Sequence, residues 1–328
     1  MILKRKDDVT SHLVKLESLL ERPEINEGQR HSLKAEIWAM RTGHQGERDA
    51  AYHIDFHWKN GLNSAVIHDL RIEQGGRSAQ IDHLILTRSL NFHVLETKNL
   101  SREVRISKLG EWEMQTASGW QGMASPIEQN RRHIEVLREY IREHQLAPKR
   151  LGFTLPVRFQ NWVLVSPQCR VKRQGSDGGR VVKMDMFERR IGEWIDRSSF
   201  LDTVTSISSF VSRKTVQNIG LALVGAHRPQ VFPYAQKFGF HRSIPAACIC
   251  ANCGDELDQR VIDYCRTHAK KFGGKHLCRL CQSSVSLPAC EKCQTEVDEK
   301  VVTYCRLHAT RVGGRLLCRS CQAISAAA

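Results

Sequence analysis

The sequence predicts an α/β protein: a mixed sheet flanked by helices, with an N-terminal helical segment and two small zinc-binding modules. Three observations lead to this prediction. The 328 residues are 41% hydrophobic, which is enough for a sizeable core. Runs with helical and strand periodicity alternate along the first part of the chain. A cysteine pattern near the C-terminus occurs twice, 40 residues apart.

Helical and strand signals follow one another from the N-terminus. Leucines recur at helical spacing in residues 5–43, so this segment is predicted to be helical, with a break near Pro23. β-rich runs punctuated by glycine predict a meander of short strands at 53–58, 64–70, 79–86, 92–97 and 104–106. On these runs His53, His57, His68 and His93 show no partner spacing, and we assign them no role. His83, next to Asp82, is interpreted as a structural residue or a surface imidazole.

Further elements extend the predicted sheet. Residues 126–143 predict an amphipathic helix, 162–165 and 181–184 two strands, and 186–196 another helix. A serine-rich stretch that could be helical then leads into an irregular connector. The expected parts are a helical segment (1–43), the α/β domain (44–200), a connector (201–245) and two modules (246–282 and 288–323).

The chain is basic throughout. It has 49 Lys+Arg against 35 Asp+Glu, a net charge of +14, and residues 241–328 contribute 13 against 8. This balance favours polyanionic partners but by itself indicates nucleic acid only weakly. No apolar run reaches the ~18 residues of a membrane span, and no apolar segment follows the first basic residues. We therefore expect a cytoplasmic protein without a membrane partner.

The repeated cysteine pattern indicates metal ligation. Eleven of the 12 cysteines lie between Cys248 and Cys321, in the tail of a long chain that shows no secretory signal. A secreted protein held together by disulfides would instead have its cysteines spread through a short chain that follows a signal peptide. Each copy contains Cys-x2-Cys, Cys-x2-His and Cys-x2-Cys, which is two more ligands than tetrahedral zinc needs. Two structural Zn²⁺ ions are expected, and zinc should contribute directly to folding of the modules.

The outer Cys-x2-Cys pairs are the preferred zinc ligands, because two such pairs form the commonest closed site. They are Cys250, Cys253, Cys278 and Cys281 in the first module, and Cys290, Cys293, Cys318 and Cys321 in the second. Cys265 with His268, and Cys305 with His308, stay open as alternative ligands.

Acidic residues interrupt two of the predicted strands. Glu96 and Lys98 share a face because they are two residues apart, and Asp82 can approach Glu96 if their strands pair. Two carboxylates with a backbone carbonyl suit Mg²⁺ or Mn²⁺, which would polarise a phosphodiester and activate a water. The simpler interpretation is a surface ion pair between Glu96 and Lys98, with Asp82 facing solvent.

The order of these motifs, with Glu47 on a preceding helix, resembles that of the PD-(D/E)XK nuclease superfamily. The local sequence is more similar still to the nuclease-related (NERD) domain of that superfamily. The matching stretches are 46–50, 68–70, 80–85, 95–99, 110–112 and 125–130, which together cover roughly residues 40–145. The resemblance implies a restriction-endonuclease-like sheet for the domain over 44–200.

The same resemblance implies a set of metal ligands. Asp82 and Glu96 would bind the divalent ion, and the Thr97 carbonyl would be a third ligand. The family usually has valine where this sequence has Thr97. The side chain at that position points to the opposite face from the site, so the chemistry should not depend on it.

The resemblance also implies roles for three further residues. Lys98 would be the catalytic lysine. Glu47 would be a helix-borne carboxylate that reaches the same metal or its water. Gln129, on the following helix, would contact the scissile phosphate or the metal shell.

We therefore expect a Mg²⁺-dependent nuclease that hydrolyses nucleic acid, with DNA as the expected substrate and zinc modules that aid its binding. One alternative is a non-catalytic nucleic-acid-binding protein that retains a nuclease fold. Another is a zinc-tethered adaptor whose partner is a protein bound through the zinc modules. Intact Asp82, Glu96 and Lys98 favour the nuclease, and the basic tail disfavours the adaptor.

Overall fold

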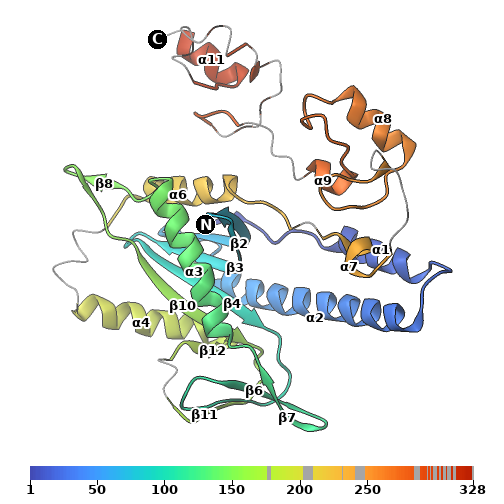
Figure 1. The fold of residues 1–328 in the computed structure, drawn as a ribbon. Helices are drawn as coiled ribbons and strands as arrows, with labels where there is room; N and C mark the ends of the chain where they lie inside the picture. Colours follow the sequence, from blue (N-terminus) through green and yellow to red (C-terminus); the bar gives the residue numbers. More distant parts are fainter. Residues whose placement is uncertain are drawn as a thin grey trace. The chain divides into compact units, whose positions relative to one another are not determined.

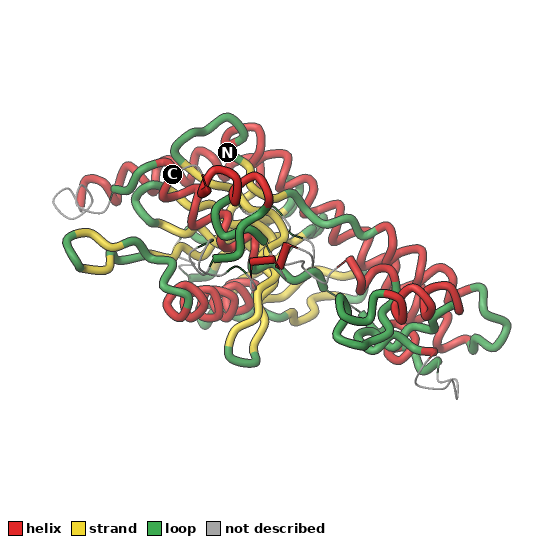
Figure 2. The backbone as a smooth tube through the Cα atoms, turned by 90° about the horizontal axis from the view of Figure 1, so that it is seen from above, coloured by secondary structure: helices red, strands yellow, loops and turns green. Residues whose placement is uncertain are grey.

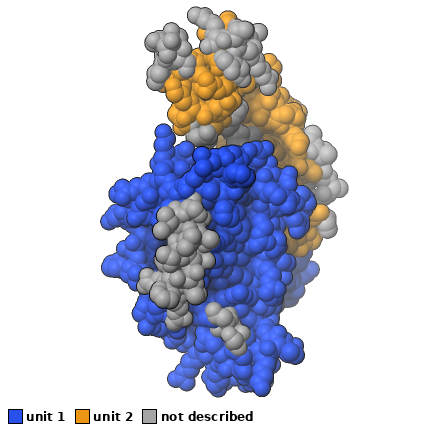
Figure 3. Space-filling model, turned by 90° about the vertical axis from the view of Figure 1, so that its left-hand side faces the viewer, with its two compact units in different colours: residues 1–230 blue, residues 231–328 orange. Residues whose placement is uncertain are grey.

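The computed structural model describes residues 1–175, 179–201, 210–230, 232–240, 248–283, 289–293, 295, 297, 301–302, 304–305, 308, 312 and 315–326. The chain divides into two compact units, residues 1–230 and 231–328 (Figure 3). Across the described ranges, no helix is both long and apolar enough to cross a lipid bilayer. The predicted α/β class is confirmed, with helices flanking the sheets, N-terminal helices and two C-terminal four-cysteine clusters.

A six-stranded mixed sheet forms the centre of the first unit (Figure 1). Its strands lie in the order β1 (Ile2–Lys4), β2 (Ser64–Gln74), β3 (Arg77–Thr87), β4 (Asn91–Lys98), β10 (Arg158–Val165) and β12 (Val181–Lys183). The strands β2, β3 and β4 form an antiparallel meander. The pairs β1–β2, β4–β10 and β10–β12 are parallel.

Helices cover both faces of this sheet, and in Figure 2 the strands lie between them. The helices on the sheet are α2 (Glu27–Trp58), α3 (Pro126–Glu143), α4 (Phe187–Leu201) and α6 (Arg213–Gly225), with a 3-10 turn, η1 (Met184–Met186), before α4. Helix α1 (Thr10–Leu20) packs on α2. Successive strand residues point to opposite faces. In β3, Leu84 and Leu86 therefore pack with residues of α3 and α6, and Ile85 packs with residues of α2 and α4.

The prediction of a strand at 53–58 is wrong, because these residues form the last turns of α2. Helix α2 is a single helix of 32 residues, begun by a capping box between Asn26 and Gln29, so it also crosses the expected boundary at residue 43. Apolar and polar residues alternate at 53–58 and imitate a strand. Ala50 and Ile54 are nevertheless buried one turn apart against the sheet, which fits the helical period.

A smaller four-stranded sheet packs near the end of β10. It contains β11 (Val171–Arg173), β5 (Val104–Ile106), β6 (Trp112–Thr116) and β7 (Gly119–Met123), in that order. Val104, Trp112 and Val163 share one buried cluster, so this sheet covers the C-terminal part of β10. A short hairpin, β8 (Lys149–Arg150) with β9 (Phe153–Thr154), precedes β10.

The expected connector 201–245 contains a helix that belongs to the first unit. In α6, Val216, Ile219 and Leu223 are buried in the same cluster as Ala65 and Ile67 of β2. The short helix α7 (Tyr234–Lys237) follows. The serine-rich stretch of the sequence lies mostly at 202–209, outside the described residues.

The second unit contains little regular structure. Its described helices include α7, α8 (Gln259–Thr267), α9 (Arg279–Ser283) and α11 (Arg319–Ala326). Asp258 caps the start of α8, and its side chain accepts the backbone N–H of Val261. Each module has its own small core, in which cysteines are packed with a few aliphatic side chains. Such cores are too small to fold unaided, which fits a requirement for metal.

Candidate active site and metal centres

The central sheet opens where β3 and β4 separate. Their pairing runs from Leu86↔Phe92 to His83↔Leu95, whereas β4 continues beside β10 as far as Lys98. One residue beyond the last β3–β4 pair, Asp82 lies opposite Glu96. The Asp82 carboxylate accepts the backbone N–H of Thr97 at 2.7 Å, in place of a strand-to-strand hydrogen bond. The two carboxylates therefore meet at the mouth of this opening.

Lys98 and Gln129 complete one side of the opening. Lys98 Nζ lies 2.7 Å from Glu96 Oε1 and donates to Gln129 Oε1 at 3.1 Å. Only 2% of Glu96 is exposed, so this pair is not a surface ion pair. The other carboxylate oxygen, Glu96 Oε2, is buried and has no hydrogen-bond partner among the described residues. An acceptor left in this state can bind a cation or an ordered water.

Helix α2 carries Glu47 to the same opening. Gly46 lies against Asn99, just after β4, and a Cβ on Gly46 would collide with the Asn99 side chain. Asn99 Nδ2 donates to the Thr42 carbonyl at 2.8 Å, and Asn99 Oδ1 accepts from Ser166. Glycine is thus required for α2 to approach the strand end closely enough to place Glu47 there.

Two residues of this cluster were not predicted. Lys6, which follows β1, forms an ion pair with Glu47, and its Nζ lies 3.8 Å from Asp69 Oδ2. Asp69 has a φ of 56°, a conformation that few non-glycine residues adopt, and it accepts the backbone N–H of Asp7. Asp69 belongs to one of the stretches on which the family resemblance was based. The sequence did not predict a role for Lys6, because it reaches this cluster only through the pairing of β1 with β2.

Burial and mutual repulsion raise the pKa values of the carboxyl groups. For Asp82, burial and then the Glu96 and Glu47 carboxylates hold the pKa well above its usual range. Burial also raises the pKa values of Glu96 and Glu47, against the opposing effects of Lys98 and Lys6. A divalent ion among these groups would relieve both the desolvation and the repulsion.

His133, on α3, faces Glu96 across the opening. Its Nδ1 lies 3.7 Å from Glu96 Oε2. Burial, together with the positive charges of Arg132 and Lys98, lowers the pKa of His133 to about 4. The imidazole is therefore neutral near pH 7 and does not act as a counter-ion to Glu96.

His68 and His83 have a structural role on the other side of the sheet. Their Nδ1 atoms lie 2.7 Å apart, and His68 Nε2 lies 2.9 Å from Asp55 Oδ1 on α2. His83 follows Asp82 and so points to the opposite face. This buried chain ties α2 to β2 and β3, which helps to fix the helix that carries Glu47.

The donor set at the opening fits a hard divalent ion. Asp82 and Glu96 provide carboxylate oxygens, and Glu96 Oε2 has no hydrogen-bond partner in the described part of the chain. Thr97, whose carbonyl is the predicted third ligand, lies on the strand between Glu96 and Lys98. Glu47 is the least suited to direct ligation, because Lys6 already neutralises it.

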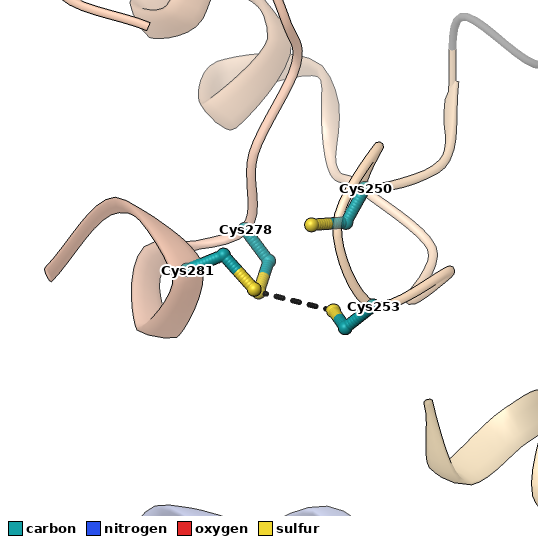
Figure 4. Close-up of side chains that lie close together, drawn as sticks. All are labelled: Cys250, Cys253, Cys278 and Cys281. Atoms are coloured by element: carbon teal, nitrogen blue, oxygen red, sulfur yellow. Dashed lines mark hydrogen bonds between the residues drawn. The ribbon is translucent and has the colours of Figure 1, made fainter. Parts of the chain in front are cut away.

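The outer cysteines form two clusters that could each hold a metal ion. In each cluster the four sulfur atoms lie within 4.8 Å of one another, and Figure 4 shows the first cluster. Cys253 and Cys278 are 3.6 Å apart, and Cys293 and Cys318 are 3.5 Å apart. These distances are far too long for disulfides and suit two ligands of one tetrahedral ion. The members of both clusters are those preferred from the sequence.

The inner cysteines have a different role. Cys265 Sγ accepts the backbone N–H of Leu277 and the side-chain N–H of Gln282, both at 3.3 Å. Cys305 forms the same bonds with Leu317 and Gln322. Each inner cysteine thus supports the loop that carries the second pair of outer cysteines, which favours the outer pairs over the inner cysteines as ligands. His268 also lies outside the cluster, with Nδ1 2.9 Å from the Tyr264 carbonyl.

Residues 42–163 match the family model of the nuclease-related domain (NERD). This range includes all of the predicted active-site residues, from Glu47 to Gln129. No curated protein and no solved structure matches the chain. The match supports a nuclease-related domain within the first unit.

Proposed function

We propose that this protein is a metal-dependent nuclease that hydrolyses phosphodiester bonds, with DNA as its substrate. The observation that carries the proposal is the meeting of Asp82, Glu96 and Lys98 where β3 and β4 separate. The match of residues 42–163 to a nuclease-related domain supports the same class of chemistry.

Each side chain at the opening has a distinct part in the proposed reaction. Asp82 and Glu96 hold a divalent ion, which supplies Lewis-acid activation of the phosphate and of a water. Lys98 neutralises the charge that develops on the phosphate oxygens. Gln129 accepts from Lys98 and so keeps its ammonium group near the carboxylates. Lys6 holds Glu47 at the rim, where this carboxylate can accept a proton from the attacking water.

A pocket elsewhere on the first unit suits a polyanion. A pocket of about 420 Å³ between α3 and β10 is lined by Arg131, Arg138 and Arg180, with Glu135 its only acidic residue. The aromatic side chains of Phe159, Trp162 and Trp194 line the same pocket. The net charge of +14 adds a long-range attraction to phosphates. We propose that the two modules bind Zn²⁺ and help to hold the substrate.

Cleavage of plasmid and linear DNA with Mg²⁺ or Mn²⁺ tests the proposal. The variants Asp82→Asn, Glu96→Gln and Lys98→Met should each lower the cleavage rate on the order of 10²-fold or more, because each removes charge at the reacting phosphate. The matched controls are Asp49→Asn and Lys172→Met, which change exposed residues of α2 and β11. The controls should cleave at the wild-type rate.

Two outcomes would contradict the proposed reaction. Metal-dependent cleavage that survives all three substitutions would remove the site assignment. Equal, salt-sensitive DNA binding by wild type and variants, with no cleavage by any of them, would instead support a non-catalytic nucleic-acid-binding protein.

A further inference from the structure

The two zinc modules are internal copies, and the positions they share can be sorted by their role. Many shared residues are explained by the fold of a single module. The cysteine clusters could hold metal, Cys265 and Gln282 support the loop of the second cysteine pair, Asp258 caps α8, and Gly273 adopts a positive φ. Shared residues that have no such role in folding point instead to a shared surface function.

A tyrosine and a histidine four residues apart are among the unexplained shared residues. Tyr264 is 44% exposed and Tyr304 is 38% exposed, although both are large aromatic side chains. The Tyr264 ring stacks on His268 with centroids 4.2 Å apart, and the Tyr304 ring lies 4.4 Å from that of His308. Each module thus pairs an exposed tyrosine ring with a histidine ring, which is exposed at His268 and half-buried at His308.

The end of helix α8 does not require the tyrosine side chain. His268 Nδ1 lies within hydrogen-bond distance of the Tyr264 carbonyl, which any residue would provide. Tyr264 also touches Phe272 at its edge, but the second copy has Val312 at that position. The tyrosine is therefore kept in both copies while its buried neighbour changes.

Basic residues follow the tyrosine in the sequence of both copies. Residues 264–279 contain five Lys or Arg and no acidic residue, and residues 304–319 contain four and none. In the first module Arg266, Lys270, Lys271, Lys275 and Arg279 are all exposed. The acidic residues of each module precede its tyrosine in the sequence, with Asp263 next to it in the first copy. An exposed aromatic platform with basic side chains around it is the combination that binds unpaired nucleobases and their phosphates.

We propose that each zinc module is a stacking platform for single-stranded nucleic acid. An unpaired base stacks on Tyr264 with His268 behind it, or on Tyr304 with His308, and neighbouring Lys and Arg side chains contact the phosphates. This inference rests on the proposed function, because it specifies the substrate that the tail holds for the nuclease-related domain. Two linked platforms on one chain bind a single strand more tightly than either alone.

Binding of fluorescent DNA to the full-length chain tests this inference. The Asp82→Asn background, without added Mg²⁺, prevents cleavage during the measurement. In this background Tyr264→Leu and Tyr304→Leu should each weaken binding to a single-stranded oligonucleotide by roughly tenfold, because one base loses its stacking partner. Tyr→Phe at the same positions should bind like the background protein, since the ring is retained. Tyr52→Leu, which removes an exposed tyrosine of α2, is the matched control.

The zinc content of every variant should stay at two per chain, which excludes unfolding as the cause. Single-strand binding that is unchanged in the Tyr264→Leu/Tyr304→Leu double variant would overturn the inference. So would equal weakening of binding to a blunt duplex of the same sequence. Cleavage is measured separately, with the chain in which Asp82 is intact. Unchanged single-strand binding by the tyrosine variants would therefore not contradict the proposed hydrolysis. Likewise, absence of cleavage would not affect the binding measurement.

Discussion

At the residue scale, the opening between β3 and β4 combines groups that oppose one another. Glu96 is 2% exposed, Asp82 lies opposite it, and the pKa values of both are raised. The ionised forms of these two carboxyl groups are therefore less stable in the folded chain than they would be in water. Such local destabilisation is common at sites whose purpose is to bind an ion or a reacting group.

Asp82→Asn should make the metal-free protein more stable near pH 7. A group whose pKa is raised on folding binds protons more tightly in the folded state, so it destabilises the fold as pH rises above its unfolded pKa. A neutral amide removes this effect and can still accept the Thr97 N–H. We expect the melting temperature to rise by a few degrees, because 1 kcal/mol corresponds to about 2–4 °C in a domain of this size.

The advantage of Asp82→Asn should disappear in acid, where the wild-type carboxyl is itself protonated. Added Mg²⁺ should stabilise the wild type and not the variant. Thermal melts in chelator and in Mg²⁺ at several pH values measure both effects. A variant that is less stable than the wild type at neutral pH would contradict this account of the site.

At the element scale, local sequence patterns predicted a helix correctly where a single apolar face of that helix packs on the sheet. The predicted helix over 126–143 is confirmed as α3, because its apolar stripe packs on the sheet. The alternation at 53–58 misled the prediction, because Ile54 and Trp58 continue the buried face of a long helix. In the modules, spacing alone could not separate the inner from the outer cysteines, whereas hydrogen bonds do so.

Cys253→Ser and Cys265→Ala should therefore differ in zinc content. Loss of Cys253 removes a member of the first cluster, and the purified chain should contain about one zinc instead of two. Loss of Cys265 removes only the bonds to Leu277 and Gln282, so zinc should stay near two while the module loses about 1–2 kcal/mol. Metal analysis of reduced protein distinguishes them, and loss of zinc from Cys265→Ala would show that the inner cysteine is a ligand.

At the scale of the whole molecule, the chain consists of two units with different sources of stability. The first unit has a large core between its sheet and helices, to which α6 contributes from beyond residue 210. The second unit has small cysteine-rich cores. The first should thus fold without zinc, whereas the second should require it.

Truncation tests this division. Residues 1–230 should melt cooperatively and be insensitive to zinc chelation. Residues 1–210 lack α6, whose Val216, Ile219 and Leu223 are buried. Each such side chain contributes about 1.5–3 kcal/mol, so their sum is comparable with the roughly 5–15 kcal/mol of a whole domain. The shorter chain should lose its cooperative transition in circular dichroism, and identical melts for both chains would contradict the packing of α6.

The sequence by itself determined the class of fold and the repeat of the cysteine pattern, and it placed Asp82, Glu96 and Lys98 on neighbouring strands. These features depend on residues that are close together in the chain, or on a repeated segment whose two copies can be aligned with each other. Only the tertiary structure decided that Lys6 and Asp69 join Glu47, that α6 completes the core, and that Glu96 is buried. Each of these depends on strand pairing or helix packing between distant segments, and such contacts leave no periodic signal in the sequence.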